Sequence, residues 1–118
     1  MLGLLLVDHG SRNPEANAQL LDMAERVRRL RPDDLVASCH LEIVEPSIAS
    51  GIATLVAAGA TRILLLPYFL SAGRHVSVDI PRLATAAASG HPGIDITVAA
   101  ALGPHDLLAR LLIERAGL

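Results

Sequence analysis

The chain has 118 residues, a length typical of one domain, and we expect residues 1–118 to form a single domain. Apolar residues make up 52% of the chain and charged residues 19%, a balance that excludes an intrinsically disordered protein. Aromatic residues make up only 2% and the net charge is −2, so we expect no nucleic-acid partner.

The first half of the chain predicts two strands around one helix. The apolar run Leu2 to Val7 is typical of a strand that is covered on both faces. Asn13 and Pro14 then predict a helix start, because asparagine is a common N-cap and proline favours the first helical position. A second apolar run, about Leu35 to Ile43, predicts the next strand. The helix between them has an apolar stripe of Ala16, Leu20, Met23, Val27 and Leu30.

The middle of the chain repeats this pattern. The segment Glu45 to Ser47 opens a predicted second helix, and Gly59 is its expected C-terminal glycine. The apolar run Ile63 to Phe69 predicts a third strand. The second helix, which precedes this strand, should bury a stripe of Ile48, Ile52, Leu55 and Val56.

The last third predicts a helix, a strand and a final helix. The third helix should begin near Asp79, with Pro81 inside its first turn. The run Ile94 to Ala100 predicts the fourth strand, and a fourth helix is expected to begin near Gly103 and Pro104. Its buried side chains should be Leu107, Leu108, Leu111 and Leu112.

The alternation of strands and helices predicts an α/β fold. We expect a three-layer αβα arrangement in which alternating helices cover a four-stranded parallel sheet, with right-handed crossovers. Ligands of such sheets bind beyond the carboxyl ends of the strands. The segments expected at that edge are Asp8 to Asn13, His40 to Ser47, Ser71 to Pro81 and Ala101 to His105.

Three polar residues stand out at that edge. His9 follows the first predicted strand, His75 follows the third, and Glu42 lies at the end of the second. Two imidazoles and a carboxylate with open positions would suit a divalent ion such as Fe, Co, Ni or Zn. The alternative for each histidine is a hydrogen-bonded residue at a strand end. Glu42 is harder to explain structurally, because a carboxylate at the end of a buried strand needs a partner.

The other candidate residues allow plainer interpretations. Cys39 should point to the opposite face of its strand from His40 and is interpreted as a small buried hydrophobe, with a soft metal ligand as the alternative. His91 is interpreted as an exposed turn residue, and His105 as a helix cap, with a residue at the edge of the site as the alternative.

Two arginines lie close to the candidate histidines. Arg12 follows His9 by three residues, and Arg74 directly precedes His75. Guanidinium groups match carboxylates well, so the two arginines would attract a polyanionic substrate to the mouth of the cleft.

Three motifs resemble those of a known family. Residues 7–14 read VDHGSRNP, residues 41–48 read LEIVEPSI, and residues 66–81 read LPYFLSAGRHVSVDIP. These segments resemble the HGSR, LE-x-x-EPS-I and P-x-FL-x-x-G-x-H-x-x-x-DIP motifs of the short sirohydrochlorin chelatases. The likeness covers nearly the whole chain, and the motifs keep their order and spacing.

The resemblance implies the insertion of Co²⁺ or Fe²⁺ into sirohydrochlorin, toward cobalamin or siroheme, by a class II chelatase fold that needs no nucleotide. By position, the metal-binding and catalytic residues of the family map onto His9, His75 and Glu42. No cofactor is implied beyond the substrate metal, which would be Co²⁺, Fe²⁺ or Ni²⁺. One departure is Asp8, which stands where many relatives have glycine and could orient His9 or shift its protonation.

The resemblance also leads to predictions about substrate contacts and assembly. Arg12 and Arg74 are predicted to contact the acetate and propionate groups of the tetrapyrrole, and Ser11 and Gly73 to line its site. Longer members of the family carry two such units in tandem. A chain with one unit resembles the members that act as homodimers, whose two lobes would enclose the tetrapyrrole.

The cysteine count and the longest apolar stretch lead to expectations about the cell compartment and about membrane contact. The single cysteine, Cys39, cannot form an internal disulfide, which favours a reducing cytoplasm. The longest apolar stretch, Gly51 to Gly73, is interrupted by Arg62 and Pro67, so we expect no membrane partner.

Two other functions fit the same residues. A metal or tetrapyrrole carrier could use the histidine and glutamate set without accelerating insertion. A histidine phosphatase could use His9 as its nucleophile, but the carboxylate of Asp8 beside it would repel a phosphate group.

Overall fold

The computed structural model describes the whole chain, residues 1–118, and confirms the alternation of strands and helices. The elements in chain order are β1 (Leu2–Asp8), α1 (Pro14–Leu30), β2 (Leu35–His40), α2 (Ile48–Ala57), β3 (Arg62–Pro67), a π-helical turn (His75–Asp79), α3 (Ile80–Ala88), β4 (Asp95–Val98) and α4 (Asp106–Arg115). All neighbouring strands pair in parallel, in the order β2-β1-β3-β4.

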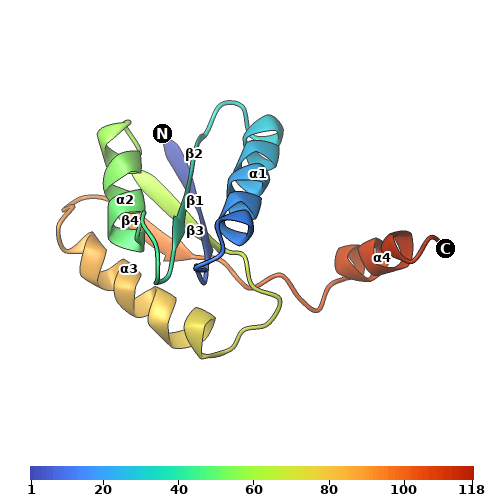
Figure 1. Ribbon diagram of the computed structural model, residues 1–118. Coiled ribbons are helices and arrows are strands. Elements are labelled where there is room, and N and C mark those ends of the chain that lie inside the picture. The colour runs from blue at the N-terminus through green and yellow to red at the C-terminus, as the bar shows by residue number, and fades with distance from the viewer.

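The sheet lies between two layers of helices, as predicted (Figure 1). Helix α1 covers one face, and α2 and α3 lie together on the other. The larger core is between the sheet and α2 and α3, where Leu5, Ile52, Leu65 and Ile80 are fully buried. Each such side chain contributes about 1.5–3 kcal/mol through burial. The smaller core under α1 consists of Leu6, Leu20 and Ala24.

Local signals correctly predicted the starts of the first two helices and the end of the second. The Asn13 side chain accepts a hydrogen bond from the backbone N–H of Glu15 at 3.0 Å and so caps α1. Ser47 caps α2 in the same way through Ser50 N–H. Gly59 follows α2 with a φ of +108°, a conformation that favours glycine.

The second strand is shorter than predicted, because it ends at His40 rather than Ile43. Beyond His40, the backbone N–H of Glu42 bonds to the carbonyl of His9 at 3.1 Å instead of continuing the ladder. Ile43 then has a φ of +77°, and Val44 N–H bonds to Glu42 C=O at 2.9 Å. These features define a γ-turn of the rarer, strained kind. The strands β3 and β4 likewise end two residues before the predicted ends, at Pro67 and Val98.

The third helix begins close to its predicted start, but a helical turn precedes it. Helix α3 begins at Ile80, and Pro81 lies in its first turn as predicted. The π-helical turn from His75 to Asp79 leads directly into α3, so His75 lies on helical backbone rather than in an open loop.

The prediction for the last helix was wrong in two respects. Helix α4 begins at Asp106, after an N-cap at His105, rather than near Gly103. None of its residues is buried, although four leucines were expected to pack onto the sheet. Helix α4 extends away from the sheet on the segment that follows β4 (Figure 1). The four leucines form an apolar stripe, but only Leu108 is partly covered within this chain, and Leu107, Leu111 and Leu112 are exposed. No helix has the length and apolarity needed to cross a membrane.

Candidate metal site

Backbone hydrogen bonds join the loops after β1 and β2 at the carboxyl edge of the sheet. The backbone N–H of Leu41 donates to the carbonyl of Asp8 at 2.8 Å, and Glu42 N–H donates to the carbonyl of His9. Gly10, with a φ of +92°, lies so close to this loop that a Cβ would fall 2.1 Å from the Glu42 carbonyl oxygen. Only glycine permits this approach, which puts the Glu42 side chain beside His9.

His9 and Glu42 are in direct contact. His9 Nε2 lies 2.6 Å from Glu42 Oε1, and His9 Nδ1 lies 3.0 Å from the carbonyl oxygen of Gly10. Both ring nitrogens therefore face oxygen acceptors, so the two hydrogen bonds need a proton on each nitrogen or a proton on Glu42. The Gly10 carbonyl orients the ring so that Nε2 is the nitrogen available to a ligand in place of Glu42.

His75 lies against His9. The two ring centroids are 4.9 Å apart, with the rings edge to face at 72°. His75 Nδ1 lies 3.2 Å from Asp79 Oδ2, which leaves Nε2 as its free nitrogen. Phe69 stacks on His75 at 6.3 Å between ring centroids. A histidine with one nitrogen held by a carboxylate and the other free is arranged as metal-binding histidines commonly are.

The structure thus brings together the three residues predicted as metal ligands and catalytic groups. Their side chains are between 41% and 57% exposed, so a ligand from solvent can reach them. Glu42 was expected in a buried strand and instead is exposed, because the γ-turn carries it out past the sheet edge. No group of three or more His, Cys, Asp or Glu side chains is already arranged to hold a metal ion. His9 and Glu42 satisfy each other instead.

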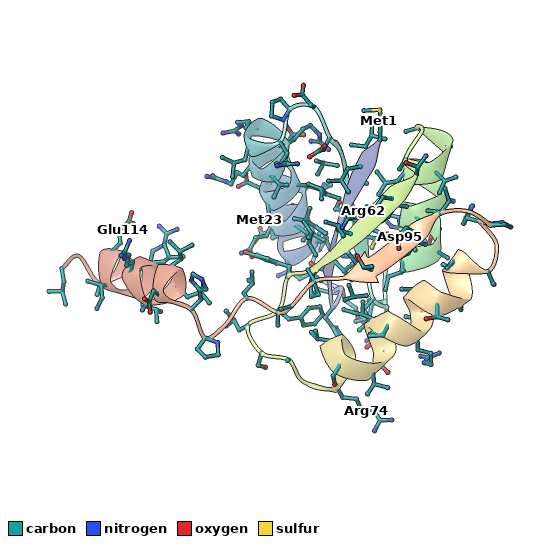
Figure 2. The ribbon with its side chains drawn as sticks, turned by 180° about the vertical axis from the view of Figure 1, so that it is seen from behind. Met1, Met23, Arg62, Arg74, Asp95 and Glu114 are labelled. Atoms are coloured by element: carbon teal, nitrogen blue, oxygen red, sulfur yellow. The ribbon has the colours of Figure 1, made fainter.

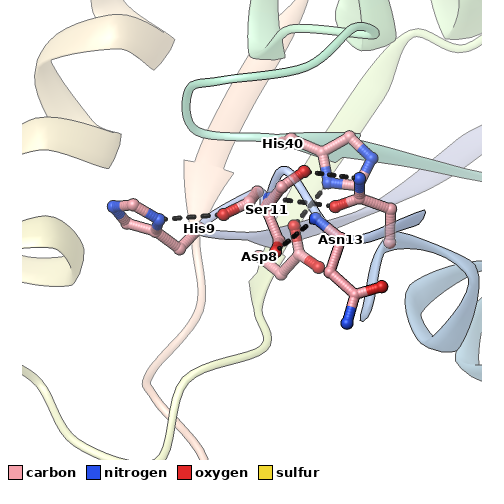
Figure 3. A network of polar contacts seen from close by, with 7 residues as sticks. Asp8, His9, Ser11, Asn13 and His40 are labelled. Carbon is pink, nitrogen blue, oxygen red and sulfur yellow. Dashed lines mark hydrogen bonds and ion pairs between the residues drawn. The ribbon is translucent and has the colours of Figure 1, made fainter. Parts of the chain in front are cut away.

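The Asp8 carboxylate pairs with His40 rather than with His9, so the predicted role of orienting the His9 ring by direct contact is wrong. Its Oδ1 lies 2.5 Å from Nδ1 of His40, which is 6% exposed (Figure 3). The two residues face each other across the parallel ladder of β1 and β2. The pair therefore ties together the strand ends that carry His9 and Glu42. Sequence reasoning missed it because the register of the two strands was unknown.

Asp79 and Phe69 were not identified as site residues either. The signal for Asp79 was the four-residue spacing from His75, which places the two side chains on one side of a helical turn. Phe69 had no such signal, because its contact with His75 depends on the path of the loop between them.

Cys39 has no role in the site. It is fully buried in the core between the sheet and α2, as the interpretation of a small hydrophobe predicted. Burial, and to a smaller extent the negative charge of Asp8, raise the pKa of the Cys39 thiol to about 12. A thiol this hard to ionise is a poor metal ligand.

Of the four residues predicted to contact substrate, two are exposed arginines and two form local hydrogen bonds with the backbone. Arg12 and Arg74 are exposed, and Figure 2 shows Arg74 pointing outward at the start of the helical segment that leads into α3. The Ser11 hydroxyl accepts a hydrogen bond from Asn13 N–H at 3.0 Å and shapes the turn before α1. The Gly73 carbonyl accepts from Val76 N–H at 3.1 Å at the start of the π-helical turn.

The two remaining histidines lie away from the cluster. His105 caps α4, because its Nδ1 accepts from Leu107 N–H at 3.0 Å, which was one of its two interpretations. His91 lies in the turn before β4, at the opposite edge of the sheet.

Fold and site together define a parallel α/β protein with a histidine and carboxylate cluster at the carboxyl ends of its strands. The sequence profile of the CbiX family matches residues 3–117, and the chain belongs to this family.

Curated relatives and a solved structure agree with that assignment. The chain is 38% identical over 113 residues to the chloroplastic sirohydrochlorin ferrochelatase of Arabidopsis thaliana, covering 96% of this chain and 50% of the relative. It is 30% identical over 123 residues to the sirohydrochlorin cobaltochelatase of Methanococcoides burtonii, covering 98% of this chain and 94% of the relative. The cobalt complex of the sirohydrochlorin chelatase SirB from Bacillus subtilis subspecies spizizenii superposes with a TM-score of 0.92 and 28% identity, covering 98% of this chain and 50% of SirB.

The chain therefore spans about half the length of the Arabidopsis and Bacillus proteins and nearly all of the Methanococcoides protein.

Proposed function

We propose that this protein is a sirohydrochlorin chelatase that inserts Co²⁺ or Fe²⁺ into the tetrapyrrole at the cluster of His9, Glu42 and His75. The observation that carries the proposal is this cluster, in which two histidines and a carboxylate from three strand-end segments lie in contact at an open edge. Support comes from the relatives, whose names give both a ferrochelatase and a cobaltochelatase, and from the cobalt bound by SirB.

Metal uptake in this proposal replaces the proton shared by His9 and Glu42. The two atoms are 2.6 Å apart, whereas two N and O ligands of one ion are separated by roughly 3.0–3.4 Å. A movement of the exposed Glu42 side chain by less than about 1 Å opens the pair. His75 Nε2 then supplies a third ligand from the neighbouring ring. Because the entering ion displaces a proton, metal uptake releases protons to solvent.

The same groups serve the second half of the reaction. Insertion removes two N–H protons from the tetrapyrrole, and the metal must leave its protein ligands as the ring nitrogens bind it. As the metal leaves, His9 and Glu42 regain the ability to hold a proton between them. The pair thereby accepts one proton from the macrocycle as it gives up the metal, and the freed Nε2 of His75 accepts the second and passes it to solvent. No cofactor beyond the substrate metal enters this scheme.

The remaining elements of the proposal concern the substrate and the assembly. Arg12 and Arg74 pair with carboxylate groups of sirohydrochlorin, and Ser11 and Gly73 line the approach to the ring. Residues 1–118 act as one domain, and two copies form a homodimer that encloses the tetrapyrrole without nucleic acid or membrane. The buried free thiol of Cys39 supports a reducing cytoplasm as the working compartment.

The test is anaerobic metallation of sirohydrochlorin, followed by absorbance, with Co²⁺, Fe²⁺ and Ni²⁺ in parallel. We expect insertion faster than the uncatalysed reaction, and a loss of at least about tenfold in His9→Ala and in His75→Ala at subsaturating metal. The matched control is His91→Ala, which removes an imidazole at the opposite edge of the sheet and should keep the full rate.

Two results would contradict the proposal. Wild-type rates in both His9→Ala and His75→Ala would remove these residues from the site. A folded wild-type protein that binds Co²⁺ but accelerates insertion of no metal would be a metal or tetrapyrrole carrier.

A further inference from the structure

The two histidines of the candidate site are held by different kinds of partner. His9 Nδ1 faces the carbonyl oxygen of Gly10 at 3.0 Å (Figure 3). The charged partner of His9 is Glu42, which is itself a proposed metal ligand. His75 Nδ1 instead faces a carboxylate outside the proposed ligand set, Asp79 Oδ2, at 3.2 Å. His9 is therefore held by a group that must move when metal binds, whereas His75 is held by one that can stay in place.

The Asp79 side chain has no part in starting helix α3. Asp79 occupies the N-cap position, where an aspartate commonly accepts a hydrogen bond from the backbone of the first turn. Its side chain makes no such bond, because its own backbone is already helical, with a φ of −70° and a ψ of −45°. The one hydrogen bond of the carboxylate is to His75, and the side chain is 26% exposed. The fold therefore leaves this carboxylate to the histidine.

The π-helical turn that carries both residues is firmly attached to the rest of the chain. Val76 is 7% exposed and belongs to the larger core. The backbone N–H and the hydroxyl of Ser77 both donate to the carbonyl of Gly73, at 2.9 and 3.0 Å. Turns of the π type are rare and often occur at functional sites. Because this backbone is fixed, His75 and Asp79 meet without the ordering of a loop when a ligand binds.

The partner of Nδ1 decides which nitrogen of His75 can bind a metal ion. An ionised carboxylate accepts hydrogen bonds and donates none, so Asp79 keeps the ring proton of His75 on Nδ1. The lone pair of the ring is then on Nε2, on the side away from Asp79. Phe69 stacks on the ring at 6.3 Å between centroids and restricts its rotation. His75 therefore presents an open nitrogen while His9 and Glu42 are still paired.

We propose that Asp79 is a positioning residue of the candidate metal site, which fixes the tautomer and the direction of the His75 ring so that Nε2 is open to a divalent ion. Its negative charge also stabilises the ring when Nε2 carries the positive ion. The proposal rests on the proposed function in one respect, the assignment of His75 as a ligand of the substrate metal.

The first test needs no variant of Asp79. NMR spectra that correlate ring protons with ring nitrogens distinguish the two tautomers of a histidine, and they are recorded on the metal-free full chain at mildly alkaline pH, where imidazole is neutral. The signals of His75 are identified by their loss in His75→Ala. We expect the proton of His75 on Nδ1. A proton on Nε2 would overturn the proposal, because Asp79 would then not determine the tautomer.

The second test changes the carboxylate. Asp79→Asn introduces an amide that can donate to Nδ1, which favours a ring proton on Nε2. We expect the spectrum of His75 to shift toward that tautomer, and Co²⁺ to bind at least about tenfold more weakly in isothermal titration calorimetry. Asp79→Glu keeps the charged acceptor and should stay within about threefold of the wild-type affinity. Weaker binding without a change of tautomer would reduce Asp79 to a structural residue and contradict the proposal.

The matched control is Asp95→Asn, which makes the same chemical change at the start of β4. The Asp95 carboxylate lies 3.7 Å from Arg62 and contacts no histidine. The control should keep the wild-type tautomer of His75 and the wild-type Co²⁺ affinity. Equal weakening by Asp79→Asn and Asp95→Asn would mean that Asp79 acts only through the net charge of the chain. Circular dichroism checks that both variants are folded, as expected for an Asp79 side chain that caps no helix.

These measurements separate the role of Asp79 from the proposed reaction, because neither of them uses sirohydrochlorin. If Asp79 behaves as expected and the protein inserts no metal, Asp79 positions a ligand of a metal carrier and only the proposed reaction is wrong. If the wild type inserts metal and Asp79→Asn binds Co²⁺ as tightly as the wild type, the role of Asp79 is wrong and the reaction stands.

Discussion

At the scale of single residues, Glu42 has two opposing roles at the candidate site. Its Oε1 lies 2.6 Å from His9 Nε2 in a hydrogen bond that holds the ring in place, and it occupies the nitrogen that a metal would need. We expect Glu42→Gln to weaken Co²⁺ binding by about 10- to 100-fold, because an amide keeps the shape but loses the negative charge. Isothermal titration calorimetry with Co²⁺ measures this.

The matched control for that variant is Glu45→Gln. Glu45 is also exposed in the same loop, but its carboxylate bonds to the Ser50 hydroxyl at 3.1 Å rather than to a histidine. Its loss should leave Co²⁺ affinity unchanged. Equal weakening by both variants would mean that Glu42 acts only through the general charge of the loop.

Asp8 and His40 form the buried polar pair beside the site. Removing the carboxylate leaves His40, 6% exposed, without its partner, so Asp8→Ala should lower the free energy of unfolding by about 2 kcal/mol or more. The comparison is Asp95→Ala, which breaks an exposed pair with Arg62 and should cost less than about 0.5 kcal/mol. Urea denaturation measures both. Similar small losses would mean that the pair does not hold the two strand ends together.

Cys39 predicts a loss of stability at alkaline pH. Its pKa is about 12 in the fold against an ordinary 9.0, so the folded state holds the thiol proton more tightly than the unfolded chain. The contribution is complete below pH 9.0 and is lost as pH rises toward 12, with a slope that approaches about 1.4 kcal/mol per pH unit. Urea midpoints above pH 9.0 should fall more steeply for the wild type than for Cys39→Ala. Parallel slopes would show that the thiol ionises freely in the fold.

At the scale of elements, the ends of β1 and β2 depend on one glycine. Gly10 and Gly93 both have positive φ, +92° and +86°, but a Cβ would collide with the Glu42 carbonyl only at Gly10. Gly93→Ala therefore reports the backbone cost alone, about 1 kcal/mol, whereas Gly10→Ala should cost at least about 3 kcal/mol and weaken Co²⁺ binding. Denaturation and calorimetry measure the two effects. Equal losses would mean that separating the loop after β1 from the loop after β2 does not affect the site.

The sequence predicted the elements better than their ends. Continuous apolar runs and caps such as Asn13 and Ser47 depend on nearby residues, so the order of strands and helices was readable. The end of β2 was not, because it depends on a hydrogen bond from Glu42 to His9, 33 positions earlier in the chain. His9 and Glu42 could be expected near each other because the carboxyl ends of parallel strands meet at one edge, whereas the Asp8–His40 contact depends on the register of β1 and β2, which the sequence does not reveal.

Helix α4 shows a second limit of sequence patterns. The leucines at 107, 108, 111 and 112 correctly predicted an amphipathic helix. A stripe of this kind indicates that the helix packs against another apolar surface, but it does not identify that surface. The expectation of burial in the same chain was therefore a default for this fold class, and the structure contradicts it.

At the scale of the whole molecule, the two faces of the sheet are unequally covered, and folding should be coupled to association. The face under α2 and α3 holds most of the fully buried side chains, while a groove of about 740 Å³ lined by Met23, Leu66 and Tyr68 stays open on the face under α1. In the homodimer proposed above, unfolding yields two chains from one folded dimer. Mass action then makes the melting temperature depend on protein concentration.

The size of that effect follows from general enthalpies of unfolding. At about 0.7 kcal/mol per residue, two chains of 118 residues give about 165 kcal/mol, which corresponds to a rise in Tm of about 3 °C for each tenfold increase in concentration. Differential scanning calorimetry over two decades of concentration should show this rise. A Tm independent of concentration would mean that the open face is stable in water by itself and that the chain does not form the proposed homodimer.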